Sequence, residues 1–202
     1  MKVLKDDKYK LILSAAHKEF IDKGFKEASM RNIAREAKVL PSNIYNYFKN
    51  KNELFLTIVK PAKDELYAFT EQHHKDENAD FNQVSTFSYL EEEVEAYIQV
   101  IYKHKAEIRI MLYHSEGSSL ENFRDSFTDY LTSISKNQIK QIRQNYPQTT
   151  DISDFFIHAQ SSWMVSILGE IVTHNLSKKK VREFFREFFK FEIAGWKELT
   201  GI

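Results

Sequence analysis

The pattern of hydrophobic and polar positions between residues 29 and 49 predicts two short helices joined by a tight turn. Apolar side chains recur at helical spacing over residues 30–37, so they form one stripe along a first helix that begins after Ser29. The period then breaks before Pro41. Proline is favoured in the first turn of a helix because its missing N–H would have no partner there. A second helix is therefore expected to begin at Pro41.

This second helix places its polar side chains outward. Ile44 and Phe48, four residues apart, share the face that packs on the first helix. The outer face is left with hydroxyl and amide groups, from Ser42, Asn43, Tyr45, Asn46 and Tyr47. Asparagine pairs with adenine in the major groove, serine serves several bases, and tyrosine hydroxyls reach phosphates. The face is typical of a DNA-reading helix, although any helical hairpin with a polar outer side shows the same pattern.

Two further helices flank this pair. Apolar positions over residues 11–20 predict a helix with an acidic cap at residues 6–7 and an end at Gly24. After the pair, Asn50 and Glu53 form a capping box, which opens a fourth helix. A capped helix on each side makes the pair part of a small helical domain.

Pro61 stands inside the fourth helix if that helix runs to about Gln72. A proline at an interior position removes one backbone hydrogen bond and kinks or breaks the helix. Two readings follow. Either the helix ends near Lys60 and restarts, or Pro61 marks a hinge between the N-terminal domain and the rest of the chain.

Periodicity in the remaining chain predicts helices that open near residue 88 and at Ser118, and helices over 105–114, 153–175 and 178–199. The last two are apolar over more than half of their circumference, so each needs a second partner beyond its own domain. We expect an isologous four-helix dimer interface. Its expected residues are Met164, Leu168, Ile171, Phe184, Phe188, Phe191 and Trp196.

The central helices also carry many aromatic side chains and a few polar ones. These either pack as an ordinary core or line a cavity that suits a flat or apolar small molecule. The candidate lining residues are Phe69, Tyr97, Ile101, His104, Tyr113, Phe123, Phe127, Phe156, Gln160 and Trp163.

Composition narrows the class of protein. The 202 residues suffice for one large or two small domains, and there is no cysteine. No histidines stand at a ligand spacing, so we expect neither a metal nor a cofactor. No run of some 18 apolar residues appears, so we expect a cytoplasmic protein with no membrane partner.

The charge is distributed unevenly along the chain. Residues 1–60 hold 13 Lys and Arg against 7 Asp and Glu, a net charge of +6, and the remainder carries −6. A basic N-terminal module on an acidic body favours nucleic-acid binding.

Across about 50 residues the N-terminal segment resembles the DNA-binding domain of the tetracycline-repressor (TetR/AcrR) family. The resemblance is carried by Ala15-Ala16, Phe20, Gly24-Phe25, Ser29 to Val39, Ile44 to Lys51, and Glu53-Leu54. It implies an all-α fold with an N-terminal three-helix helix-turn-helix domain over residues 1–50. A larger helical domain over residues 51–202 would bind an effector and dimerise.

The resemblance also implies residue roles. Ser29 and Arg31 would meet the phosphate backbone or the groove edge, and Pro41 would open the recognition helix. From that helix, Ser42, Asn43 and Asn46 would face base edges. Flanking phosphates would be held by Tyr45, Tyr47 and Lys51, with half-burial in the core as the alternative for Tyr45.

Two positions depart from the family pattern, which commonly has Gly at position 38 and Ser or Thr at position 40. Lys38 must then adopt a positive φ, at a cost of about 1 kcal/mol. Leu40 has no side-chain oxygen to cap the second helix of the pair, so the protein lacks the stabilisation of about 1 kcal/mol that an N-cap residue gives.

The function expected is that of a bacterial, homodimeric transcription regulator. It would repress from a palindromic DNA operator and be released by a small hydrophobic or aromatic ligand. The alternative is a DNA-binding dimer without a small-molecule effector, controlled by a protein partner. No nucleophile elbow, zinc-protease or phosphate-loop pattern occurs, so we expect no enzyme activity.

Overall fold

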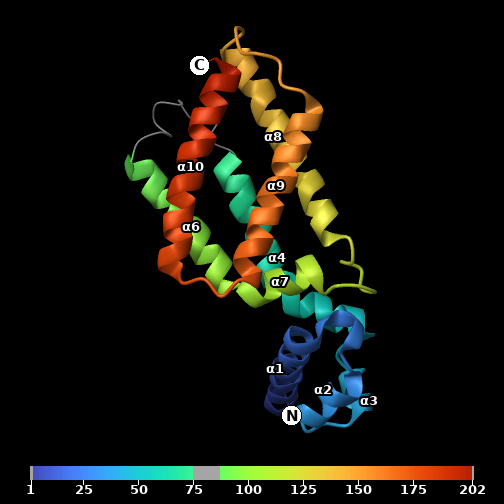
Figure 1. Cartoon of the computed structure of the whole chain (residues 1–202). Helices are drawn as coiled ribbons and strands as arrows, with labels where there is room; N and C mark the ends of the chain where they lie inside the picture. Colours follow the sequence, from blue (N-terminus) through green and yellow to red (C-terminus); the bar gives the residue numbers. More distant parts are fainter. Residues whose placement is uncertain (1, 75–86, 202) are drawn as a thin grey trace. The chain divides into compact units, whose positions relative to one another are not determined.

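The computed structural model describes residues 2–74 and 87–201, and every regular element in these two stretches is an α-helix (Figure 1). The predicted all-α fold is confirmed. The helices are α1 (Lys2–Glu27), α2 (Met30–Glu36), α3 (Pro41–Ile44), α4 (Lys51–His74), α6 (Phe87–Lys103), α7 (Lys105–Tyr113), α8 (Phe123–Asn145), α9 (Asp154–Thr173) and α10 (Lys178–Thr200). Within the described stretches, none combines the length and the apolar character that crossing a membrane requires.

The helices form two compact units. The N-terminal unit holds the chain up to Asp64 together with Lys105–Arg124, and the C-terminal unit holds Glu65–His104 with the chain from Asp125 onward. The predicted DNA-binding domain over residues 1–50 and effector and dimerisation domain over residues 51–202 are defined by function, and this division stays a prediction. By packing, the first half of α4 and all of α7 belong with the helix-turn-helix.

An aromatic cluster forms the centre of the N-terminal unit. The ring centroids of Phe20 and Phe25 each lie 5.1 Å from that of Phe55, in edge-on geometry. Helix α7 adds Ile108 and Met111, both fully buried. Burying side chains of this size stabilises a fold by about 1.5–3 kcal/mol each, so α7 is part of this core rather than an appendage.

The last turn of α1 is set apart from the helix by Gly24, which has φ 72° and ψ 179°. The predicted interruption at Gly24 is confirmed, and the next amide, of Phe25, donates to the His114 carbonyl oxygen at 2.8 Å. The predicted acidic cap is wrong, because α1 begins at Lys2 and residues 6–7 lie inside it.

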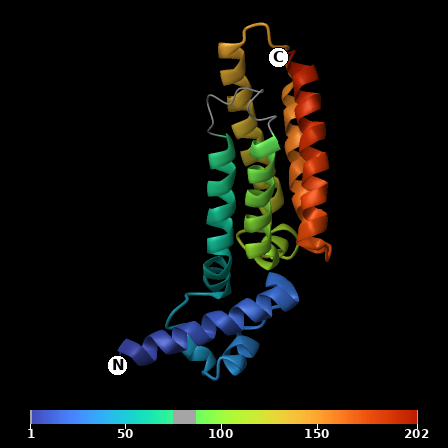
Figure 2. The same cartoon turned by 90° about the vertical axis from the view of Figure 1, so that its left-hand side faces the viewer.

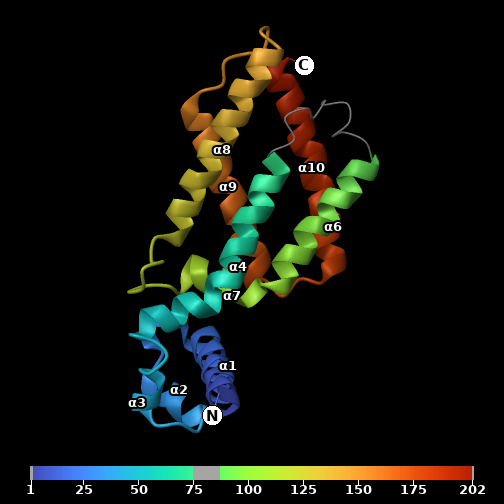
Figure 3. The same ribbon diagram turned by 180° about the vertical axis from the view of Figure 1, so that it is seen from behind.

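In the C-terminal unit, the second half of α4 runs alongside α6, α8, α9 and α10 (Figure 2). From behind, α4 lies between α8 and α6 (Figure 3). Helix α4 continues through Pro61, so the reading in which it ends near Lys60 is wrong.

Helix α8 begins at Phe123 rather than at Ser118. The Ser118 hydroxyl donates to the Ser115 carbonyl oxygen at 2.6 Å and accepts from the Leu120 amide at 3.0 Å. These bonds stabilise a turn, because serine offers the backbone an alternative to the helix.

Candidate nucleic-acid interface

Helices α2 and α3 form the predicted pair. The turn between them needs a left-handed residue, and Lys38 has φ 54°, as its departure from glycine predicts. The Val39 amide closes the turn by donating to the Ala34 carbonyl oxygen at 2.9 Å. Ser29 is the N-cap of α2, but its side chain makes no capping hydrogen bond. A different residue therefore caps α2.

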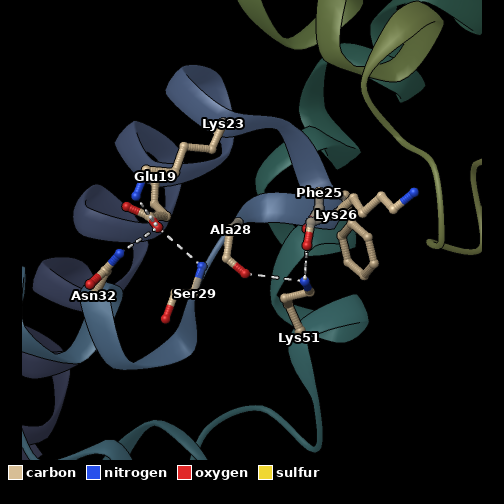
Figure 4. A network of polar contacts seen from close by, with 8 residues as sticks. All are labelled: Glu19, Lys23, Phe25, Lys26, Ala28, Ser29, Asn32 and Lys51. Carbon is tan, nitrogen blue, oxygen red and sulfur yellow. Dashed lines mark hydrogen bonds and ion pairs between the residues drawn. The ribbon is translucent and has the colours of Figure 1, made fainter.

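That residue is Glu19 of α1 (Figure 4). Its carboxylate oxygen accepts from the Ser29 amide at 3.0 Å and from the Asn32 side chain at 3.1 Å, and Lys23 lies 3.2 Å away. Burial would raise the pKa of the Glu19 carboxyl, but these three donors outweigh it and bring the pKa below its ordinary value. Glu19 thus holds the start of α2 on α1.

Lys51, at the start of α4, bridges to the end of α1 (Figure 4). Its ammonium donates to the carbonyl oxygens of Phe25, Lys26 and Ala28 at 2.8, 3.2 and 3.1 Å. It also lies 4.5 Å from the centroid of the Phe25 ring. An ammonium has three donors, so this geometry uses them all inside the N-terminal unit. The role differs from the predicted phosphate contact.

The recognition helix is shorter than predicted. Helix α3 ends at Ile44, and turns follow through Tyr47, whose amide donates to the Ile44 carbonyl oxygen at 2.9 Å. Ile44 and Phe48 are 0% and 3% exposed, so they pack inward as predicted. The predicted base-facing residues Ser42 and Asn46 are exposed, and Asn43 is partly exposed.

The other predicted contact residues divide by exposure. Arg31 and Pro41 are exposed, and Ser29 is half-buried. Tyr45 is 53% exposed, which does not fit the alternative of half-burial in the core. Tyr47 is half-buried. Surface chemistry suited to DNA therefore extends from α2 through the turns after α3.

The half-burial of Tyr47 comes from Tyr9 of α1, a residue the sequence reading missed. The Tyr9 ring stacks on Phe48 at 5.6 Å and meets the Tyr47 ring at 5.8 Å. Helical spacing in the sequence indicates that Tyr9 faces inward, because it extends the apolar stripe of Ile12, Ala16 and Phe20 by one turn. Tyr9 positions the end of the recognition segment.

The C-terminal unit encloses a cavity of about 110 Å³ lined by residues of α4, α6, α8, α9 and α10. Five of the ten predicted lining residues are there: Phe69, Tyr97, Ile101, Phe127 and Gln160. Among the described residues, none of the lining side chains is charged, and the polar ones are hydroxyls such as Thr70 and Ser135 and the amide of Gln160. The arrangement suits an uncharged, mostly apolar occupant.

The other five predicted lining residues lie elsewhere. Tyr113 and Phe123 belong to the N-terminal unit. His104 is buried outside the cavity lining, with its Nε2 2.8 Å from a carboxylate oxygen of Glu65. Phe156 and Trp163 are 40% and 42% exposed on the outer side of α9.

The two apolar stripes of α9 face opposite ways from the prediction. Met164, Leu168 and Ile171, expected at a dimer interface, line the cavity. On α10, Phe188 is only 6% exposed within a single chain, so it too belongs to the interior. The sequence shows that two stripes exist, but either can face inward, and neighbouring helices decide which one does.

The outer side of α9 and α10 is an aromatic face, defined by Phe156, Trp163, Phe191, Trp196 and Leu199. Phe191 is 63% exposed, and Phe184 is half-buried at the same helix pair. The Glu192 carboxylate beneath the face accepts from Gln160 at 2.6 Å and from the Trp196 indole N–H at 3.1 Å. Burial raises the pKa of Glu192 above its ordinary value, against the lowering effect of both hydrogen bonds.

Residues 12–58 match the family model described as bacterial regulatory proteins of the tetR family. The match takes in α2 and α3 together with parts of α1 and α4, so the helix-turn-helix segment is of the TetR type. The chain is also 44% identical, over 61 residues, to the uncharacterized HTH-type transcriptional regulator YhgD of Bacillus subtilis (strain 168). That match covers 28% of this chain and 32% of the relative, so it concerns a segment of each protein rather than the whole.

Solved TetR-like structures match nearly the whole chain. A regulator from Rhodococcus sp. RHA1 has a TM-score of 0.63 at 16% identity, covering 93% of this chain and 96% of its own. NalD of Pseudomonas aeruginosa, the secondary repressor of the MexAB-OprM multidrug efflux pump, has a TM-score of 0.60 at 16% identity, with 91% and 94% covered. At these identities the likeness concerns the fold. The solved structures therefore show the fold of the chain, and the family match concerns its N-terminal helix-turn-helix segment.

Proposed function

We propose that this chain is a TetR-family repressor that binds a palindromic operator as a twofold dimer and releases it when an uncharged apolar ligand enters the C-terminal cavity. The observation that carries the proposal is the recognition segment. Its Ser42, Tyr45 and Asn46 are exposed, while Ile44 and Phe48 anchor it in the core of the unit. Polar side chains presented by an anchored recognition segment of this kind read base edges in the major groove.

The aromatic face supports the dimer. Exposed side chains as large as Phe191 and Trp163 on one side of a helix pair favour burial against a second copy of the same face. Phe191 and Trp196, from the predicted interface, belong to this face. A twofold dimer sets two recognition helices about 34–36 Å apart, which requires a palindrome. An operator-binding protein of this kind acts in the cytoplasm, where the DNA lies.

The cavity supports the effector. A ligand shifts the protein only if it binds one conformation more tightly than the other. An occupant of the cavity contacts five helices of the C-terminal unit at once, so its affinity is sensitive to their arrangement. NalD is a repressor, and repression is the outcome we propose here.

Selection of bound DNA from a random pool tests the proposal. We expect one enriched palindrome whose affinity falls steeply with salt, since phosphate contacts release counterions. If no sequence is enriched, the proposed function is wrong.

The effector is tested with the selected operator and a panel of uncharged aromatic compounds. We expect one class to release the wild-type protein but not a Leu168→Trp variant, whose indole fills the cavity. Release only by a protein partner, with both proteins insensitive to the panel, would instead support the regulator without a small-molecule effector.

A further inference from the structure

We propose that Leu40 reads a thymine base in the operator by contacting its 5-methyl group. The inference rests on the proposed function, because it assigns a specificity to the same recognition segment. Leu40 is the residue immediately before α3, with φ −72° and ψ 145°. The residues at the N-terminal end of a recognition helix are those that reach base edges.

The exposure of Leu40 is unusual for its chemistry. It is 68% exposed, more than any other large hydrophobic side chain described in the N-terminal unit, where Tyr45 and Leu11 follow at 53% and 52%. The core of the unit therefore does not explain a leucine at this position. Local helix chemistry does not explain it either, because Leu40 forms no side-chain cap on α3. A residue that breaks a local rule without a compensating contact is expected at a functional site.

The side chains next to Leu40 indicate which group on the DNA Leu40 contacts. Ser42, Asn43 and Asn46 supply hydrogen-bonding groups, whereas Leu40 and the adjacent exposed Pro41 supply none. The apolar side chains of Leu40 and Pro41 cannot form a hydrogen bond with a phosphate or with the polar edge of a base. In the major groove the one apolar group on a base edge is the 5-methyl of thymine. The leucine therefore complements a thymine at the step next to the bases read by Ser42 and Asn43.

Deoxyuridine tests this contact atom by atom, because it differs from thymidine only in lacking the methyl group. Each thymine pair of the selected palindrome is replaced symmetrically by uracil, and binding of the wild-type protein is measured by fluorescence anisotropy. We expect one pair to weaken binding about fourfold per half-site, the effect of one buried methyl group, while the others change it little. At that position, cytosine should bind weakly and 5-methylcytosine should recover part of the affinity.

Two variants assign the effect to the side chain. Leu40→Ser removes the apolar group and supplies an N-cap residue, so it should fold with an unchanged or higher midpoint of thermal unfolding. It should bind the thymine and uracil operators equally. Leu11→Ser removes the other exposed leucine of the unit and should keep the fourfold discrimination. This control separates a contact at α3 from a general loss of apolar surface.

The outcomes distinguish the two proposals. If a palindrome is enriched but uracil is tolerated at every position, the Leu40 contact is wrong while the operator reading stands. The same holds if Leu40→Ser keeps the discrimination. If nothing is enriched, the proposed function fails and the Leu40 contact fails with it.

Discussion

At the scale of single residues, Lys51 shows how a cation expected to bind DNA can instead hold the protein together. Its ammonium donates to three carbonyl oxygens at the end of α1 and lies over the Phe25 ring. Carbonyls at a helix end lack partners within the helix, so a cation there is stabilising. The same charge that favours a phosphate therefore favours this internal site.

We expect Lys51→Met to lower the free energy of unfolding by about 2 kcal/mol, the scale of hydrogen bonds to a charged group. Methionine keeps the apolar stem and removes the donors. Urea unfolding measures the free energy of unfolding. Operator binding across a salt series measures whether the Lys51 charge contributes a phosphate contact. The slope of log affinity against log salt should stay unchanged. If the variant instead has a salt slope reduced by about 1 and an unchanged free energy of unfolding, Lys51 contacts a phosphate as predicted.

Glu19 gives a pH dependence at the same scale. Its pKa in the folded protein is lowered by the Ser29 amide, Asn32 and Lys23, so the ionised form stabilises the fold. That contribution is complete above the ordinary glutamate pKa of about 4.3 and is lost as pH falls through the lower folded-state value.

We expect Glu19→Gln to destabilise the protein by about 2 kcal/mol at pH 7, because an amide cannot accept from all three donors as a carboxylate does. The difference from wild type should shrink as pH falls below 4. Chemical unfolding at a series of pH values measures it. A difference independent of pH would show that ionisation of Glu19 does not matter to stability.

At the scale of elements, the last turn of α1 depends on contact with His114, the residue that follows α7. Gly24 has a positive φ with extended ψ, a region open essentially to glycine alone. A Cβ there would lie 2.9 Å from the His114 Cβ and 3.0 Å from its carbonyl oxygen. The backbone carbonyl has no rotamer that would relieve the contact.

We expect Gly24→Ala to lower the free energy of unfolding by about 3 kcal/mol, from strain and the clash together. Gly117→Ala is the matched control. It has a similar φ of 78°, but its Cβ would meet only the Phe25 ring at 3.9 Å. Thermal unfolding of both variants gives the comparison. Equal losses would mean that backbone strain alone, and not contact with His114, requires Gly24.

The elements also show what the sequence can specify. Periodicity located the last two helices closely, since they are predicted over 153–175 and 178–199 and observed over Asp154–Thr173 and Lys178–Thr200. The resemblance predicts a left-handed Lys38, because the family commonly has glycine at this position, and Lys38 has φ 54°. Periodicity found both apolar stripes of α9 but not which one faces inward, because that depends on packing across five helices.

At the scale of the whole molecule, the predicted functional boundary lies between residues 50 and 51, whereas the compact units divide the chain differently. The first half of α4 and α7 pack with the helix-turn-helix, although α7 begins 54 residues after α4 does. Contacts between segments this far apart have no local signature. The family resemblance predicts the DNA-binding residues. The role of Glu19 comes only from the packing, whereas the helical spacing of Tyr9 already places it on the apolar stripe of α1.

The proposed dimer yields the last prediction. Phe191 is 63% exposed at the centre of the aromatic face, so Phe191→Asp should leave the chain folded and set a charge against its own copy across a twofold axis. Sedimentation should show a monomer. Affinity for the full palindrome should fall about a hundredfold, because the second half-site is then no longer bound at high effective concentration.

Affinity for an isolated half-site should remain that of the wild type, since the recognition segment is unchanged. Tyr146→Asp introduces the same charge at another exposed aromatic, 40% exposed and directly after α8 rather than on α9 or α10, and should leave the dimer intact. A Phe191→Asp protein that still sediments as a dimer, with wild-type affinity for the palindrome, would place the interface elsewhere. Loss of half-site binding together with dimerisation would mean instead that the two units are coupled through the interface.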